Sequence, residues 1–282
     1  DASGNNSALC TAINVTTQSS VPAPTITQHP AAASVCPNGT ATFTVAASGT
    51  GLSYQWQKNS ANLANGGHYA GCTTATMTVS SASSADAANY RCVVTNAGGS
   101  ATSNQAALTV KAATTITAQP AAQALCAGAT ANFSVTATGD GTLTYQWQKD
   151  SVNLSGATSA SLQITNVSSA NAGSYRCVVT GGCGTATSNT AALTITAATA
   201  ITTQPQAQSV AAFGTATFTV AATGANLTYQ WQKNSANLSN DDNISGATTT
   251  SLQISSATAA DAANYRCVVT GTCGSVTSNQ AA

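Results

Sequence analysis

The stretch YQWQKNSANL at residues 54–63 and the stretch DAANYRCVVT at residues 86–95 form a pair that occurs three times in this chain. The first stretch recurs at 145–154 and 229–238, and the second recurs at 171–180 and 261–270. The tryptophans of the first stretch are 91 and then 84 residues apart. A repeat of this length indicates one small domain per copy, so the 282 residues are predicted to form three tandem domains.

Apolar and polar residues alternate within each repeat. In ATFTV (41–45), Ala41, Phe43 and Val45 share one face while the threonines share the other. LSYQW (52–56) and YRCVV (90–94) alternate in the same way. This period of two predicts antiparallel strands with one buried face, and turn-rich segments separate them. About seven such strands in each repeat predict an all-β fold built from β-sandwiches.

The order of the motifs then makes a family resemblance specific. A tryptophan in a middle strand, followed by D-x-x-x-Y-x-C, resembles the immunoglobulin fold, and the tyrosines match its tyrosine corner: Tyr90, Tyr175 and Tyr265. With the TITxQP-like openings, the chain from residue 24 to 282 resembles the Ig-like repeats of bacterial surface and secreted proteins. The expected domains are an N-terminal extension strand at 1–21 and three Ig-like sandwiches at 22–112, 113–197 and 198–282.

The composition argues against several classes of function. Only 5% of the residues are charged, glutamate is absent, and the formal net charge is zero, so no field attracts nucleic acid or acidic ligands. No signal peptide or membrane span is recognised, so membrane insertion is not expected. Nine cysteines without metal-type spacing favour an oxidising, extracellular location.

No catalytic, metal or cofactor site is predicted. Two histidines and no glutamate leave no base–nucleophile arrangement, and Asp86 and Asp261 precede the tyrosine corner, where Asn171 replaces them in the middle repeat. NDDN (240–243) has oxygen ligands suited to Ca²⁺, but a solvated loop is favoured because no other repeat contains it. His68 and Tyr69, in the insertion NGGHYAG, are the only candidates for ligand binding, and a passive loop is favoured there too.

The cysteines depart from the immunoglobulin pattern. Valines stand where an antibody-like domain has its B-strand cysteine: Val45, Val135 and Val220. The F-strand cysteines therefore lack their usual partner: Cys92, Cys177 and Cys267. In the second repeat, the resemblance to bacterial repeats implies a Cys126–Cys183 bond, with Cys177–Cys183 as the competitor.

The other repeats each lack part of this pattern. In the first, Gly98 replaces the hairpin cysteine, which leaves Cys72 and Cys92 as local partners for Cys36. In the third, Cys267 and Cys273 are present but Ala211 stands in the position of Cys126. Because the count is odd, at least one cysteine is free or bonded to another chain, and Cys10 has no domain of its own.

The two ends of the sequence suggest a function. The last repeat, GTCGSVTSNQAA (271–282), stops before the ALTV or ALTI strand that completes the other two, while NNSALCTAINV (5–15) resembles SNTAALTITAA (188–198). We therefore expect a structural subunit that polymerises head to tail by strand addition. The predicted intersubunit strand contains Ala8, Leu9, Cys10, Ile13 and Val15, with Cys10 bonding to Cys267 or Cys273 of the neighbour.

Three other interpretations remain open at this point. The chain is a fragment of a longer tandem-repeat adhesin or stalk, or its N-terminal segment is a disordered tail with a free thiol. Binding of a glycan or another protein is the third, although the aromatic residues that would carry it fall mostly at core positions of the repeat.

Overall fold

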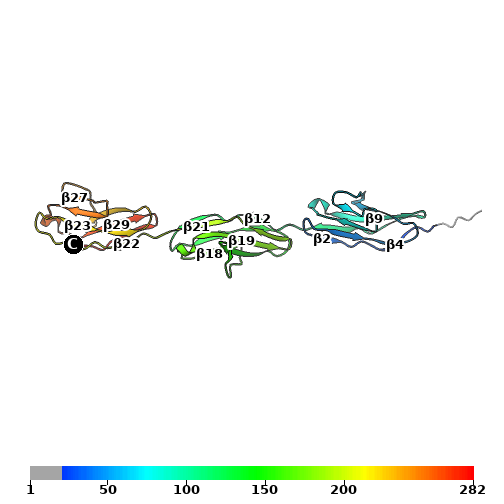
Figure 1. Ribbon diagram of the computed structural model, residues 1–282, viewed down its shortest axis with the longest axis horizontal. Coiled ribbons are helices and arrows are strands. Elements are labelled where there is room, and N and C mark those ends of the chain that lie inside the picture. The colour runs from blue at the N-terminus through cyan, green and yellow to red at the C-terminus, as the bar shows by residue number, and fades with distance from the viewer. Residues whose placement is uncertain (1–20) are drawn as a thin grey trace, which may run out of the picture. The chain divides into compact units, whose positions relative to one another are not determined.

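The computed structural model describes residues 21–282. In Figure 1 the strands form three groups along the chain, coloured blue to cyan, green, and yellow to red. They divide into two compact units, the first ending at Ala113 and the second beginning at Thr114. The first unit contains one β-sandwich, here called domain 1, and the second contains two, domains 2 and 3. The predicted fold class, all-β with three tandem Ig-like sandwiches, is confirmed.

Each domain is a series of short strands with a single-turn 3-10 helix before the longest strand. Domain 1 contains β1 (Thr25–Gln28), β2 (Ala33–Val35), β3 (Ala41–Thr44), β4 (Ala46–Ser48), β5 (Ser53–Lys58), β6 (Ala61–Asn62), β7 (Tyr69–Ala70), β8 (Thr76–Val79), η1 (Ser84–Asp86), β9 (Ala88–Asn96), β10 (Gly99–Thr102) and β11 (Ala106–Val110). Domain 2 contains β12 (Thr115–Ala118), β13 (Gln123–Cys126), β14 (Ala131–Ser134), β15 (Thr136–Thr138), β16 (Thr144–Lys149), β17 (Val152–Asn153), β18 (Ser161–Ile164), η2 (Ser169–Asn171), β19 (Gly173–Gly181), β20 (Gly184–Thr187) and β21 (Ala191–Thr196). Domain 3 contains β22 (Ala200–Thr203), β23 (Ala216–Thr219), β24 (Ala221–Thr223), β25 (Thr228–Lys233), β26 (Ala236–Asn237), β27 (Ile244–Ser245), β28 (Ser251–Ile254), η3 (Ala259–Asp261), β29 (Tyr265–Gly271) and β30 (Gly274–Thr277).

The strands of domain 1 form two layers. One layer has the order β2-β11-β9-β5-β6, with β10 also paired to β9, and β2 runs parallel to β11. The other layer contains the three-stranded sheet β3-β8-β7, and β1 and β4 form a separate two-stranded pair. Domain 2 repeats the first layer as β13-β21-β19-β16-β17. The last strand of each of these domains is therefore inserted between two others, one antiparallel and one parallel to it.

The core of each domain follows from the period-two pattern of its strands. In β3 the residues alternate between buried and exposed, and Phe43 stacks on Tyr90 with ring centroids 5.0 Å apart. Trp56 is fully buried and its Nε1 donates to the Thr74 carbonyl at 2.9 Å, so its one polar atom is satisfied. Domains 2 and 3 repeat the same cluster around Trp147 and Trp231.

The predicted tyrosine corner is present in all three domains. The Tyr90 hydroxyl donates to the Asp86 carbonyl at 2.9 Å, and the equivalent tyrosines donate to Asn171 and Asp261. The Asp86 carboxylate accepts hydrogen bonds from the backbone N–H and the hydroxyl of Ser83, both at 2.9 Å. This geometry confirms the turn-capping role expected for the aspartates, because the asparagine of domain 2 makes the same bonds.

Candidate functional site

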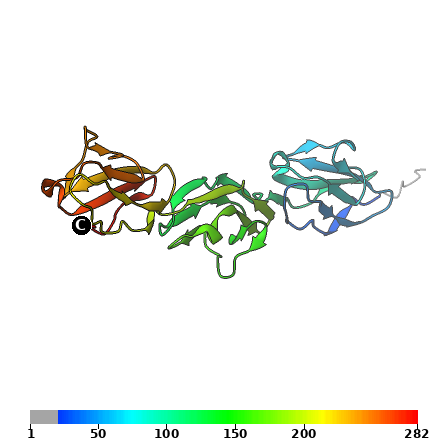
Figure 2. The ribbon, with the colours of Figure 1, turned by 60° about the vertical axis from the view of Figure 1, so that its left-hand side comes forward.

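Domain 3 differs from the other two domains at the place of their last strand. Its chain ends with Ala281 bridged to Tyr265, where the two backbones exchange bonds of 2.8 and 2.9 Å, and Ala282 accepts from the Gln208 N–H at 2.8 Å. In domain 2 the equivalent pairing is made by the first residues of β21, which continues to Thr196. Figures 1 and 2 place the C-terminus at the surface of this domain.

A pocket of about 400 Å³ lies next to Ala282. The core side chains of Phe218, Ile254 and Tyr265 line it, and its two walls include Val210 and Ala263. In domains 1 and 2 the corresponding space holds a leucine, Leu108 or Leu193, whose side chains are 3% and 1% exposed. The pocket therefore lies where the last strand runs in domains 1 and 2, and we call it the strand slot.

The wall formed by residues 208–211 is also incomplete. Its counterparts β2 and β13 are strands that pair in parallel with the last strand of their domain, whereas among residues 21–282 this segment forms no strand. Val210 is 40% exposed and Phe213 is 78% exposed. A strand entering the slot would pair with this wall on one side and with Ala263 on the other.

Phe213 is an unusual residue at this rim. Its φ is 64°, and the equivalent positions in domains 1 and 2 are occupied by Asn38 and Gly128, residue types that tolerate this conformation. A bulky side chain that is both exposed and held at positive φ marks a locally unfavourable arrangement. The substitution of phenylalanine for asparagine and glycine at this position is visible in the sequence.

The residues predicted to fill such a slot lie outside the described part of the chain. These are Ala8, Leu9, Cys10, Ile13 and Val15. Their docking therefore stays a prediction, and the structure describes only the strand slot.

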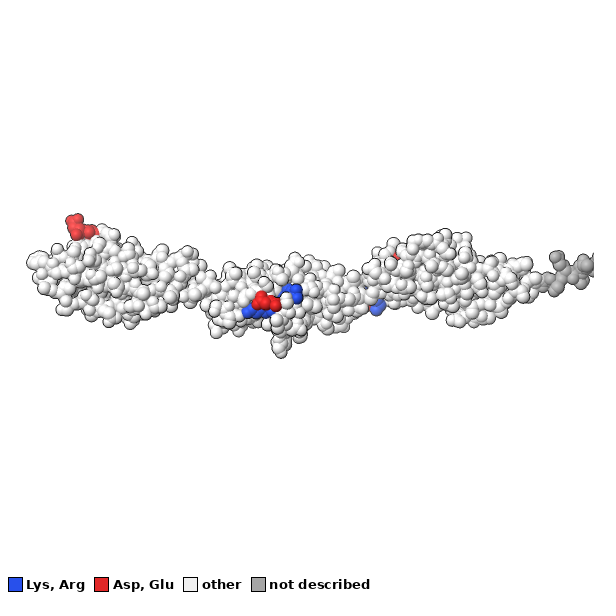
Figure 3. Space-filling view, in the orientation of Figure 1, with Lys and Arg blue, Asp and Glu red and all other residues white. Residues whose placement is uncertain are grey.

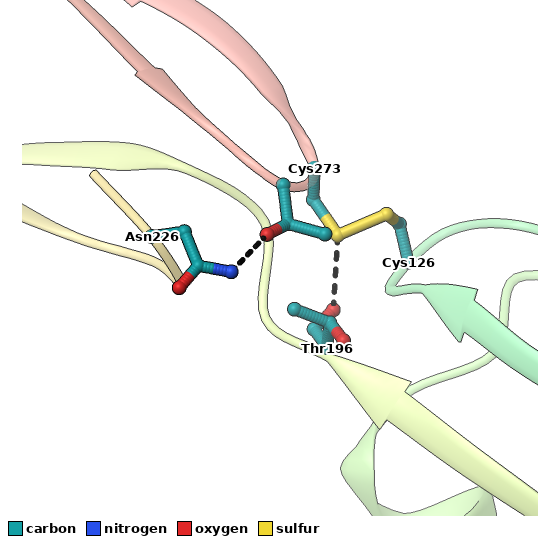
Figure 4. Close-up of a disulfide and its surroundings, with 5 residues drawn as sticks. Cys126, Thr196, Asn226 and Cys273 are labelled. Carbon is teal, nitrogen blue, oxygen red and sulfur yellow. Dashed lines mark hydrogen bonds between the residues drawn. A yellow bond between two sulfur atoms is a disulfide. The ribbon is translucent and has the colours of Figure 1, made fainter. Parts of the chain in front are cut away.

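The structure corrects the predicted disulfide of domain 2. Cys126 bonds to Cys273 of domain 3, with the two Cα atoms 5.6 Å apart, and not to Cys183. Figure 4 shows the bond, with the Cys273 Sγ 3.7 Å from the Thr196 carbonyl oxygen. The Cys177–Cys183 alternative is also wrong, because Cys177 is a buried free thiol. The sequence pattern correctly indicated that a cysteine at the end of the second strand bonds to a cysteine in a hairpin. It placed both cysteines in one domain, whereas the bond joins two successive domains.

The structure also bears on three further cysteine expectations. Cys36 and Cys183 are disulfide-bonded, and since Cys72 and Cys92 are free thiols, neither is the partner of Cys36. The predicted bond from Cys10 to Cys273 of a neighbour is contradicted, whereas the alternative bond to Cys267 stays a prediction because Cys10 lies outside the described residues. Cys273 is already bonded to Cys126, and Cys267 is fully buried in the core, where burial raises its thiol pKa to about 11.

The polar groups of the second candidate site, His68 and Tyr69, are engaged in contacts within domain 1. The Tyr69 hydroxyl donates to the Asp86 carboxylate at 2.6 Å, and the His68 Nε2 lies 3.0 Å and the Lys58 Nζ 3.6 Å from the same oxygen. Burial opposes ionisation of Asp86, but the hydrogen bonds from Tyr69 and Ser83 outweigh it and lower its pKa to about 2. The insertion is thus pinned to domain 1 by a nearly fully buried carboxylate.

The rest of the molecule offers few charges. Figure 3 shows a face on which almost all atoms belong to uncharged residues. In the loop NDDN, the Asp241 carboxylate accepts the N–H groups of Asn243 and Ile244. No helix among residues 21–282 is long and apolar enough to cross a membrane.

Comparisons with known proteins agree with this architecture. The immunoglobulin I-set domain model matches residues 24–110, and an immunoglobulin domain model matches residues 115–180 and 200–270. A three-Ig structure of titin in a Glu-to-Ala mutated variant is similar with a TM-score of 0.69 and 20% identity, covering 93% of this chain and 98% of that one. A titin I-band fragment gives the same score and identity over 92% of this chain and 97% of its own. At this identity the likeness shows the fold alone.

A curated relative matches part of the chain by sequence. Endoglucanase C of Cellulomonas fimi is 34% identical over 183 residues, which cover 61% of this chain. The match spans only 16% of the length of that enzyme. It therefore shows a shared region, and the activity named for the whole enzyme is not carried over to this chain.

Proposed function

We propose that this chain, which consists of three tandem immunoglobulin-like domains, is a non-enzymatic structural subunit of an extracellular filament. Subunits assemble head to tail when the strand slot of domain 3 receives the N-terminal segment, residues 7–16, of another copy. The observation that carries the proposal is the slot itself, a pocket of about 400 Å³ that opens the hydrophobic core where domains 1 and 2 have a buried leucine.

The chemistry of the slot specifies its occupant. The segments of domain 2 that are equivalent to the two walls, β13 and β19, both pair with β21. An extended peptide in the slot would therefore gain backbone hydrogen bonds on two sides. The floor is apolar, so alternate residues of the peptide must be apolar as well. Residues 7–16, SALCTAINVT, have the composition of this kind of strand and resemble the chain's own β21.

The direction of assembly follows from the position of the two parts. The donor segment and the acceptor slot belong to opposite ends of the chain, so the contact is heterologous and each added copy presents a new open slot. Low charge supports this mode of assembly, because only 5% of residues are charged and like-charge repulsion between packed copies is small.

Electron microscopy of the purified full chain tests the proposal. Filaments are expected for the wild type, and the combined change Leu9→Asp, Ile13→Asp and Val15→Asp should abolish them, because at least one carboxylate would have to enter the apolar slot whichever part of the segment docks. A matched control places aspartates at Ala8, Ala12 and Asn14, which alternate with the first set and are expected to face away from the core. Dispersed wild-type particles, or filaments formed equally by both variants, would refute the proposal.

A second function is favoured by the partial match to a much longer protein. In this alternative the chain is a section of a tandem-repeat surface protein or stalk, and its own continuation fills the slot. Intact mass of the native material separates the two. A mass near 27.7 kDa supports the filament subunit, and a much larger mass supports the stalk.

A further inference from the structure

The buried and exposed positions of β21 define what the strand slot accepts. Ala191 and Leu193 are buried, Ala192 and Thr194 are exposed, and Ile195 is half-buried. Domain 3 retains the counterparts of the first two residues as Ala281 and Ala282, so the slot begins at the position of Leu193. It requires an apolar residue, a polar residue and a second apolar residue, in that order.

The length of the slot is also fixed by domain 2. Leu193, Thr194, Ile195 and Thr196 pair in parallel with Gln123, Ala124, Leu125 and Cys126. The repeat places Gln208, Ser209, Val210 and Ala211 at the corresponding positions of domain 3. Four residues of a donor strand therefore contact the open wall.

Two registers that lie wholly within residues 7–16 place a large aliphatic residue first. In one register the four residues are Leu9-Cys10-Thr11-Ala12, which puts a threonine at the second inward position. In the other they are Ile13-Asn14-Val15-Thr16, which reproduces the pattern Leu-Thr-Ile-Thr of domain 2, including the final threonine. Ala12, just before this second set, also matches Ala192.

We propose that Ile13–Thr16 is the segment that enters the slot, with Ile13 at the position of Leu193 and Val15 at the position of Ile195. This assignment rests on the proposed function and names the residues that carry it. Ile13 then lies over Phe218 and Tyr265 and opposite Ala263, while Val15 covers the exposed Val210. Leu9 lies before the slot and does not contribute to it.

The register is tested by adding the donor strand to the C-terminus of the same chain, so that it can fill the slot of its own domain 3. Three versions of the full chain are extended after Ala282 by four residues: Leu-Thr-Ile-Thr as in domain 2, Ile-Asn-Val-Thr, or Leu-Ser-Thr-Ala. The last is the Leu9 register with serine in place of cysteine. Scanning calorimetry follows the unfolding transition of domain 3. The first two extensions should raise its Tm on the order of 10 °C, because they bury two aliphatic side chains and complete the sheet, and the third by less than half as much.

The outcomes separate the register from the function. If the Leu-Thr-Ile-Thr extension does not raise the Tm, the slot accepts no strand and the proposed function fails as well. If it does, but Leu-Ser-Thr-Ala stabilises domain 3 as much as Ile-Asn-Val-Thr or more, only the register is overturned. The extended chains with filled slots should also no longer accept another copy.

Single substitutions in the tail give an independent measure. Ile13→Ala should raise the critical concentration for assembly at least tenfold, since it removes the side chain that fills the deepest part of the slot. Leu9→Ala is the matched control and should change it less than twofold. The reverse ranking would overturn the assignment.

Discussion

Removing the Cys126–Cys273 bond is expected to change how far domains 2 and 3 lengthen under tension. The bond joins residues 147 positions apart, so the residues between them form a closed loop that tension cannot straighten. When the chain is pulled from Thr115 and Ala282, the force passes through residues 115–126, the disulfide and residues 273–282. These two segments contain about 22 residues, which extend to roughly 75 Å when fully stretched.

Without the bond, the loop joins the load-bearing path. At ~3.4 Å per extended residue it adds about 500 Å of chain. Single-molecule force spectroscopy on the full chain, with handles at Thr115 and Ala282, measures this length directly. The double variant Cys126→Ser/Cys273→Ser should release about 500 Å more than the wild type in the same non-reducing buffer. A wild-type chain that lengthens as far as the variant would refute the reasoning.

Four further predictions concern stability and reactivity. Leu193→Ala should destabilise domain 2 by about 2–5 kcal/mol in chemical denaturation, because it creates there a cavity like the slot of domain 3. Asp86, whose folded pKa of about 2 lies below its ordinary value of 3.8, stabilises domain 1 above pH ~4. About 2 kcal/mol of that stability should disappear as the pH falls to ~2, and an Asp86→Asn variant should lack this part of the pH profile. Phe213→Asn should raise the Tm of domain 3, because asparagine tolerates the positive φ at lower cost. Cys267 should react with a thiol reagent only after unfolding, since it is fully buried and its pKa is raised to about 11 by burial.

The core was predictable from the sequence because its pattern is local. Residues two apart on a strand share a face, so the alternation in ATFTV places Phe43 and Val45 in the core without any knowledge of the partner strand. The tyrosine corner was predictable for the same reason. The hydroxyl of Tyr90 reaches an acceptor only four residues earlier, so the motif contains both partners.

The disulfide pairing was not predictable in this way, because it depends on two domains meeting. Cys126 ends β13, and Cys273 lies in the turn between β29 and β30. Within domain 2 the hairpin position is occupied by Cys183, so the sequence offers a local partner and a distant one of the same type. Sequence spacing does not decide between Cys183 and Cys273 as the partner of Cys126, because either pairing uses each cysteine once.

The strand slot lies between these two cases. The position of the slot followed from the repeat, because ALTV and ALTI mark the last strand in the first two copies. That this position borders the hydrophobic core became clear only from the burial of Leu108 and Leu193 and from the pocket lined by Phe218. The choice between two donor registers needed the burial of alternate positions in β21, which the sequence motif did not provide.

The residue at the end of the second strand distinguishes two kinds of junction. In domain 2 it is Cys126, which bonds to the hairpin of the following domain. In domain 3 it is Ala211, and in domain 1 the hairpin position that aligns with Cys273 is Gly98. A copy docked through Ile13–Thr16 would therefore be held by strand pairing, without a disulfide at these positions.

The connecting segment differs as well. Three residues separate Thr196 from the first strand of domain 3 at Ala200, whereas eight separate Thr16 from the first strand of domain 1 at Thr25. Five additional residues lengthen the joint between copies by up to about 17 Å of extended chain. We therefore expect the angle between neighbouring domains in filament micrographs to vary more after domain 3 than between domains 2 and 3. Equal variation at the two junctions would show that the joint between copies is held by contacts other than the docked strand.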